Sequence, residues 1–213
     1  LCEMPQMNVR YSLNDGKPAI DERAHVGFGL AIDIQHAGER RLVVPVIHQA
    51  DTLTFTGFVE AYQDIISRAK AGSLSAEDYQ GATVTLTNPG TIGTTTSVPR
   101  LMNGQGVIIG VGAMDYPAEF AGVSPRKLAL LGIGKTMFVS STYDHRVIQG
   151  AASGDFLRLL DLKLSGRDGF YDRVFTALHI PVPPYTWEAD FEYDLEREKG
   201  KPARIAELIQ AYR

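Results

Sequence analysis

The sequence predicts an α/β fold in which one mixed β-sheet is covered by helices on one side and followed by a linker. Strand-like and helix-like apolar patterns intermingle along the first 167 residues, as they do when helices pack on a sheet. The composition, 44% hydrophobic and 22% charged in a chain of 213 residues, supports a packed core. After Ser165 the pattern changes to linker-like and charged sequence, which predicts a boundary near residue 167.

The first clear strand is predicted over residues 25–34, where large apolar residues alternate with small or polar ones. Gly27 and Gly29 lie on the opposite face from the large residues, and they would let another segment approach closely. Residues 41–47 predict a second strand. Pro45 within it favours a sheet edge or a bulge, since proline cannot donate to a neighbouring strand.

A helix is predicted from Leu53 to Ala69 because apolar residues recur there at helical spacing. Thr52 or Thr54 would begin this helix and Gly72 would end it. Further elements are expected as strands at 83–87, 106–114 and 127–145, the last as one strand or a broken pair, and as helices at 151–164 and 170–180.

Charge and composition argue against several classes of function. The net charge of −4 and the lack of a Lys/Arg cluster predict no nucleic-acid partner, and no apolar run is long enough to predict a membrane span. Cys2 is the only cysteine, which excludes an internal disulfide and fits a reducing, cytoplasmic setting. The five histidines have no metal-ligand spacing, so no metal site is predicted.

Two short stretches, TLTNPGTIG and TYDHRVIQG, concentrate groups that can do chemistry. His145 is the last residue of a predicted strand, and a neutral imidazole held there can take a proton near pH 7. The hydroxyl of Thr87 could donate to an oxyanion. A structural alternative stays open, in which Thr87 and Asn88 only form a turn, and an Asp144–Arg146 ion pair flanks a structural histidine.

Four blocks of sequence together carry a resemblance that is more specific than any single motif. They are PQMNVRYS, LVVPVIHQADTLTFTGFVE, SAEDYQGATVTLTNPGTIGTTTSVPRLMNGQGVIIGVGAM and STYDHRVIQGAASGDFL. In order and spacing they resemble the catalytic domain of the dihydrolipoyl acyltransferases of 2-oxoacid dehydrogenase complexes. The resemblance implies a chloramphenicol acetyltransferase-like two-layer sandwich for residues 1–167. It also implies that a first helix and strand of this domain precede Leu1.

The resemblance also implies roles for particular residues. DHRVIQG matches a DHRxxDG motif, which makes His145 the general base that deprotonates the attacking thiol. LTNPG matches the segment whose hydroxyl supports the oxyanion, here Thr87. Coenzyme A and a dihydrolipoyl group would be the substrates, and Asn88 and His25 would line their channel. For His25, a surface histidine at a strand start is an equal alternative.

Gln149 departs from the family motif, which has Asp or Asn at this position. A neutral amide can hold geometry by hydrogen bonding, but it cannot stabilise an imidazolium by charge. Because of its place in the motif, Gln149 is expected among the catalytic residues. Two hypotheses about the activity of the domain remain. One is an active succinyltransferase. The other is a weak or inactive scaffold that trimerises and positions a thiamine-dependent 2-oxoglutarate decarboxylase/dehydrogenase module.

The end of the chain refines the resemblance. ARIAELIQAYR is similar to the start of a thiamine-dependent 2-oxoglutarate dehydrogenase component, as in actinobacterial multifunctional 2-oxoglutarate enzymes. Residues 168–213 would then be a linker and first helix, and thiamine diphosphate and Mg²⁺ would bind only in the adjoining module. The implied partners are the lipoyl domain of a separate acyltransferase, a dihydrolipoamide dehydrogenase, and two further copies in a homotrimer whose sites combine His145 and Thr87 from different chains.

Overall fold

The computed structural model describes residues 1–36 and 38–184. Its strands and helices follow in the order β1 (Val9–Asn14), β2 (Lys17–Glu22), β3 (Phe28–His36), β4 (Glu39–Val43), β5 (Val46–Ile47), α1 (Phe55–Ala71), β6 (Val84–Thr87), β7 (Val107–Val111), α2 (Pro125–Leu130), β8 (Val139–Tyr143), α3 (Gly150–Leu164) and α4 (Phe170–Ala177).

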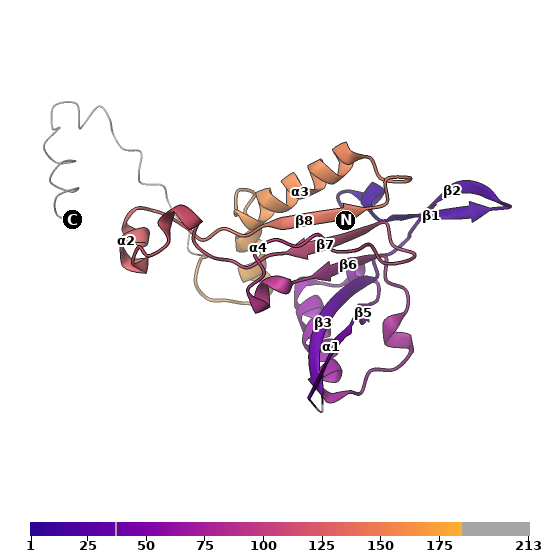
Figure 1. Ribbon diagram of the computed structural model, residues 1–213, viewed down its shortest axis with the longest axis horizontal. Helices are drawn as coiled ribbons and strands as arrows, with labels where there is room; N and C mark the ends of the chain where they lie inside the picture. The colour runs from indigo at the N-terminus through magenta and orange to yellow at the C-terminus, as the bar shows by residue number, and fades with distance from the viewer. Residues whose placement is uncertain (37, 185–213) are drawn as a thin grey trace, which may run out of the picture.

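The central sheet has the strand order β4-β3-β6-β7-β8, with β5 also paired to β3. Strands β3, β6 and β7 run parallel, whereas β4, β5 and β8 are antiparallel to their neighbours. Figure 1 shows β6, β7 and β8 side by side, with the β1–β2 hairpin projecting from one end of the molecule and α2 from the other. The predicted mixed sheet is confirmed.

Helices α1 and α3 pack on the same face of this sheet. Val84 on β6 contributes to a cluster with Phe156 of α3, and Leu86 on the same face also contacts the cluster around Ile65 of α1. The opposite face is covered by the loop before β7, where the Ser140 hydroxyl donates to the Ser97 carbonyl at 2.6 Å. The prediction of helices on one side of the sheet is therefore confirmed.

The small residues of β3 and of the segment before it permit the close approach expected from the sequence. A Cβ added at Gly27 would lie 1.9 Å from the carbonyl oxygen of Gly81, and one at Gly29 would lie 2.6 Å from the Thr85 hydroxyl. The absence of side chains at these glycines lets β3 pack directly against β6 and the segment before it.

Gly27→Ala should therefore destabilise the fold, since the new methyl group would overlap a backbone carbonyl that cannot move alone. We expect a loss of about 1–3 kcal/mol in the free energy of unfolding, measured by chemical denaturation. Gly134→Ala is the matched control, because an added Cβ there meets nothing within 4 Å. Equal stability of the two variants would contradict this account of the β3–β6 contact.

The single strand predicted over 41–47 is wrong in one respect, because the run forms two strands, β4 and β5, with Pro45 between them. The expected place of this proline at the edge of the sheet is confirmed. The predicted limits of the first helix are also confirmed. Helix α1 begins after Thr54, whose hydroxyl accepts from the Gly57 N–H at 3.1 Å, and it ends at Gly72 with φ of 68°.

The prediction of a strand over 127–145 is wrong in its first part. Residues Pro125–Leu130 form α2, and only Val139–Tyr143 form β8. Ser124 caps the helix by accepting from the Lys127 N–H, and the proline after it suits the first helical position. This serine–proline start signal outweighs the apolar run, of which Leu128 is the buried member.

The β1–β2 hairpin was not predicted. Asp15 and Gly16 form its two-residue turn with φ of 51° and 75°. Positive φ at both central positions is typical of a type I′ turn, for which Asp-Gly is a preferred sequence. The turn signal was therefore present in the sequence.

The segment after α3 folds back on the domain. The Thr56 hydroxyl at the start of α1 donates to the Ala177 carbonyl at the end of α4, at 2.7 Å. The helix expected within 203–213 lies outside the described residues. Among the helices of residues 1–184 that are described, none combines the length and apolar character needed to cross a membrane.

Candidate active site

His145 lies in the turn between β8 and α3, with its side chain exposed. The turn is anchored on both sides. Ile148 is buried in the core, and the backbone N–H groups of Val147 and Ile148 both donate to the Asp144 carbonyl. The imidazole lies 5.5 Å from the Tyr143 ring, centroid to centroid, and makes no hydrogen bond within the described part of the chain. A rigid turn therefore presents a free imidazole to the surroundings.

The neighbours of His145 form the ion pair that the structural alternative expected. Three hydrogen bonds of 2.6–3.2 Å run from the Arg146 guanidinium to the Asp144 carboxylate. These hydrogen bonds lower the pKa of Asp144. They outweigh burial, which by itself would raise it. Arg146 also lies over the Tyr11 ring of β1, 3.8 Å from its centroid. The ion pair stabilises the turn and does not involve the side chain of His145.

Gln149 occupies the N-cap position of α3, and its side chain is exposed. Its carbonyl accepts from the Ser153 N–H at 3.2 Å. No side-chain hydrogen bond connects Gln149 to His145 in the described residues, so the amide is free to turn toward a ligand.

Thr87 is the last residue of β6 and is half-buried. It follows Thr85 by two residues, so both side chains point to the sheet face opposite the helices. Asn88 comes next, exposed at the start of a 3-10 turn whose Gly90 packs against Gly112. An added Cβ at Gly90 would lie 2.3 Å from the Gly112 carbonyl carbon, so LTNPG packs tightly against the end of β7.

Within one chain, Thr87 and His145 lie at opposite ends of the sheet. The register aligns Thr87 with Gly110 and Gly110 with Ser140, at the start of β8, whereas His145 follows the end of that strand. The strand from Ser140 to Tyr143 alone spans about 10 Å, and two strand spacings of about 4.8 Å separate β6 from β8. A single chain therefore does not bring these two side chains together.

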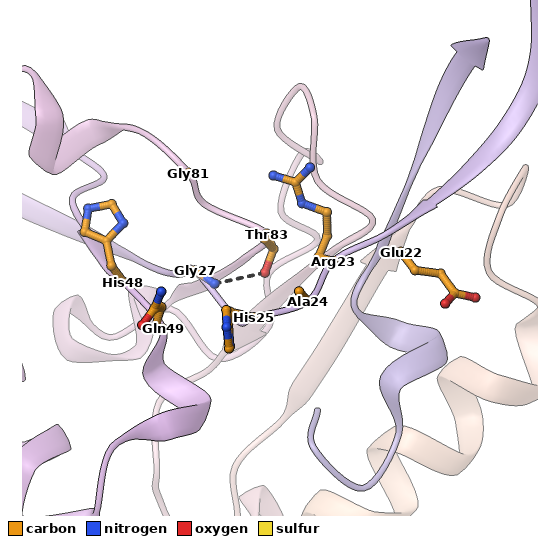
Figure 2. A pocket seen from close by; sticks show the side chains of 9 residues that line it. All are labelled: Glu22, Arg23, Ala24, His25, Gly27, His48, Gln49, Gly81 and Thr83. Atoms are coloured by element: carbon orange, nitrogen blue, oxygen red, sulfur yellow. Dashed lines mark hydrogen bonds between the residues drawn. The ribbon is translucent and has the colours of Figure 1, made fainter.

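His25 lies beside a cavity of about 550 Å³. Figure 2 shows His25, His48, Gln49 and Thr83 around it, with Thr83 hydrogen-bonded to Gly27. The channel position predicted for His25 therefore lies beside a cavity.

Sequence reasoning missed three residues of this region: Arg23 and His48, which line the cavity, and Asp51, which pairs with His25 at 3.1 Å. Asp51 is 26 residues away from His25 in the sequence, so no motif could connect them. In the described part of the chain, no group of three or more His, Cys, Asp and Glu side chains is placed to hold a metal ion.

Comparison with known proteins places this geometry in a family. Residues 1–166 match the family model of the 2-oxoacid dehydrogenases acyltransferase catalytic domain. The chain belongs to this family. It is also 54% identical over 212 residues to the multifunctional 2-oxoglutarate metabolism enzyme of Mycobacterium sp. (strain JLS), covering 99% of this chain. It spans only 16% of that protein's length.

Solved structures of the same family agree with the fold. The catalytic core of a 2-oxoacid dehydrogenase multienzyme complex from Thermoplasma acidophilum superposes with a TM-score of 0.59 and 26% identity, over 74% of this chain and 64% of its own. The dihydrolipoamide acetyltransferase of Azotobacter vinelandii gives 0.58 and 28%, over 75% and 61%. That structure concerns a serine, a histidine and an asparagine in the catalytic mechanism. This chain is thus an acyltransferase catalytic domain with an α/β fold.

Proposed function

We propose that this domain transfers succinyl groups between dihydrolipoyl thiols and coenzyme A, with His145 as general base and Thr87 as oxyanion donor. The observation that carries the proposal is the free imidazole of DHRVIQG on an anchored turn, in a chain of this acyltransferase family. The name of the Mycobacterium relative, which refers to 2-oxoglutarate, supports succinyl as the acyl group, since decarboxylation of 2-oxoglutarate leaves a succinyl unit.

The chemistry follows from the side chains. A thiol has a pKa near ~8.5, so it is mostly protonated at neutral pH, and the His145 imidazole removes its proton as sulfur attacks the thioester carbonyl. The tetrahedral oxyanion accepts a hydrogen bond from the Thr87 hydroxyl. When the carbon–sulfur bond of the leaving thiolate breaks, the proton returns from His145 to that sulfur. Gln149, four residues after His145 at the N-cap of α3, would orient the imidazole or the substrate through its amide, and Asn88 would line the channel beside Thr87.

The proposed roles require assembly, because Thr87 and His145 lie at opposite ends of the sheet in one subunit. The end that carries Thr87 exposes large apolar side chains from segments next to β6, β7 and β8: Ile92, Val98, Met114, Leu131 and Phe138, each at least 59% exposed. Exposed apolar surface of this kind marks an interaction site. We therefore propose a homotrimer in which this end of one subunit covers the His145 turn of the next.

The wider setting is part of the same proposal. The dihydrolipoyl group would arrive on the lipoyl domain of a separate acyltransferase, and a dihydrolipoamide dehydrogenase would reoxidise it. Thiamine diphosphate and Mg²⁺ would belong to an adjoining module, to which residues 168–213 would lead and which forms the succinyl group. The similarity to a much longer 2-oxoglutarate enzyme supports this arrangement.

A mixing experiment tests both the chemistry and the assembly. Trimers of His145→Ala alone or of Thr87→Val alone would contain no complete site. Co-expressed in equal amounts, the two chains should recover about a quarter of wild-type transfer from succinyl-CoA to dihydrolipoamide. Three quarters of randomly formed trimers are mixed, and each mixed trimer has one intact site of three.

The control for this experiment is mixing of the two separately purified homotrimers without subunit exchange, which should recover nothing. Co-expressed chains that stay inactive, although mixed trimers are present, would contradict sites shared between subunits. Full activity in either homotrimer would contradict the role of the changed residue.

A further inference from the structure

In the hydrogen bond between His25 and Asp51, the donor and the acceptor can be assigned. His25 Nδ1 lies 3.1 Å from one carboxylate oxygen of Asp51, and the other oxygen accepts from the Val26 N–H at 2.7 Å. The bond from Val26, followed by that from His25, lowers the pKa of Asp51. Asp51 is therefore ionised near neutral pH, and an ionised carboxylate can only accept hydrogen bonds.

An acceptor-only partner decides which nitrogen of His25 carries the proton. Nδ1 must donate to Asp51, so a neutral imidazole keeps a lone pair on Nε2. Nε2 has no hydrogen-bond partner within residues 1–36 and 38–184. Because His25 lines the cavity, the pair offers a hydrogen-bond acceptor to a ligand there.

The backbone that carries His25 is held rigidly by a buried polar network. Asn8 donates through its amide nitrogen to the carbonyls of Arg23 and His25, each at 3.1 Å. Its amide oxygen accepts from the Thr83 hydroxyl at 2.6 Å, and Thr83 in turn accepts from the Gly27 N–H. Asn8 and Thr83 are both 5% exposed. A ligand therefore meets a preorganised acceptor, which reduces the entropy lost on binding.

This acceptor lies at the same end of the sheet as the His145 turn. Asn8, which bonds the His25 carbonyl, precedes Val9, and the Val9 carbonyl abuts Gly106. The Gly106 carbonyl accepts from the Asp144 N–H, directly before His145. The cavity and the proposed base are thus joined through continuous backbone contacts.

We propose that the His25–Asp51 pair binds an amide N–H in the thiol-bearing arm of a substrate, with Asp51 as the residue that positions His25. The inference rests on the acyl-transfer function proposed above, because the pantetheine arm of coenzyme A and the acyl chain of dihydrolipoamide each carry an amide N–H and a thiol on the same arm. A cavity of about 550 Å³ falls in the range that takes small-molecule ligands.

The test uses Asp51→Asn in the full-length protein. The asparagine oxygen can still accept from Val26, but its NH₂ group would donate to His25 Nδ1 and turn Nε2 into a donor. The KM for one of the two substrates should rise about tenfold, as expected for one net hydrogen bond. The kcat should stay within about twofold, because the contact is the same in ground state and transition state. A higher KM for succinyl-CoA identifies the pantetheine amide, and a higher KM for dihydrolipoamide identifies the lipoyl amide.

A double-mutant cycle separates positioning from a merely structural role. His25→Ala should raise the same KM, and Asp51→Asn should add nothing in that background, because Asp51 acts through His25. Asp64→Asn, which removes an exposed Arg68 ion pair on α1, is the matched control and should leave both KM values unchanged.

Additive effects of Asp51→Asn and His25→Ala would overturn the positioning role. Unchanged KM values in Asp51→Asn, or a fall in kcat alone, would overturn the binding role. If the wild type transfers no acyl group, the proposed function fails instead. Calorimetric titration of coenzyme A and of dihydrolipoamide into the same variants then tests the pair by itself, and equal affinities in wild type and Asp51→Asn would overturn it.

Discussion

His145→Ala should reduce the kcat for acyl transfer between succinyl-CoA and dihydrolipoamide by about 10²–10⁴ while the protein stays folded. The loss corresponds to removal of a positioned general base, since the uncatalysed thiolate fraction near neutral pH is small. Stability should change little, because His145 is exposed and its imidazole lies beside the Tyr143 ring, without a hydrogen bond in the described residues. Initial rates and thermal unfolding of the same preparations measure both effects.

The matched control is His179→Asn. His179 is an exposed histidine after α4 with φ of 52°, a conformation that asparagine tolerates. It should leave kcat unchanged. Wild-type rates in a folded His145→Ala variant would refute the role of His145 as general base. A wild-type trimer that folds but transfers no succinyl group would favour the scaffold hypothesis that Gln149 leaves open.

Thr87→Val should lower kcat by about 10²–10³, the usual effect of removing one oxyanion donor. Valine keeps the volume and β-branching of threonine, so β6 and its half-buried end should remain intact. The only change is a methyl group in place of the hydroxyl. The KM values should change much less than kcat, because the hydrogen bond forms with the charge that develops in the transition state.

Thr87→Ser supplies the complementary variant, since serine restores the hydroxyl and removes only a methyl group. It should retain most of the wild-type kcat. A Thr87→Ser variant as slow as Thr87→Val would indicate that packing of the side chain, and not its hydroxyl, supports the activity. The pair therefore separates chemistry from local structure.

The elements that local pattern predicted well are those with a clear period or a clear boundary residue. Helix α1, between Thr54 and Gly72, and the strand ending at Thr87 followed from such signals. The apolar run before β8 misled the prediction, because apolar residues in α2 and in a strand look alike without their neighbours. The serine–proline start of α2 was the stronger signal.

The sequence by itself determined the family-specific blocks, the α/β character, and the candidates His145 and Thr87, because short-range motifs depend only on residues that are close along the chain. Only the tertiary structure decided how these groups are arranged. Strand order and direction put Thr87 and His145 at opposite ends of one sheet. Folding also brought Asp51 to His25 across 26 residues. Such long-range pairings arise from backbone packing between elements, which no local pattern encodes.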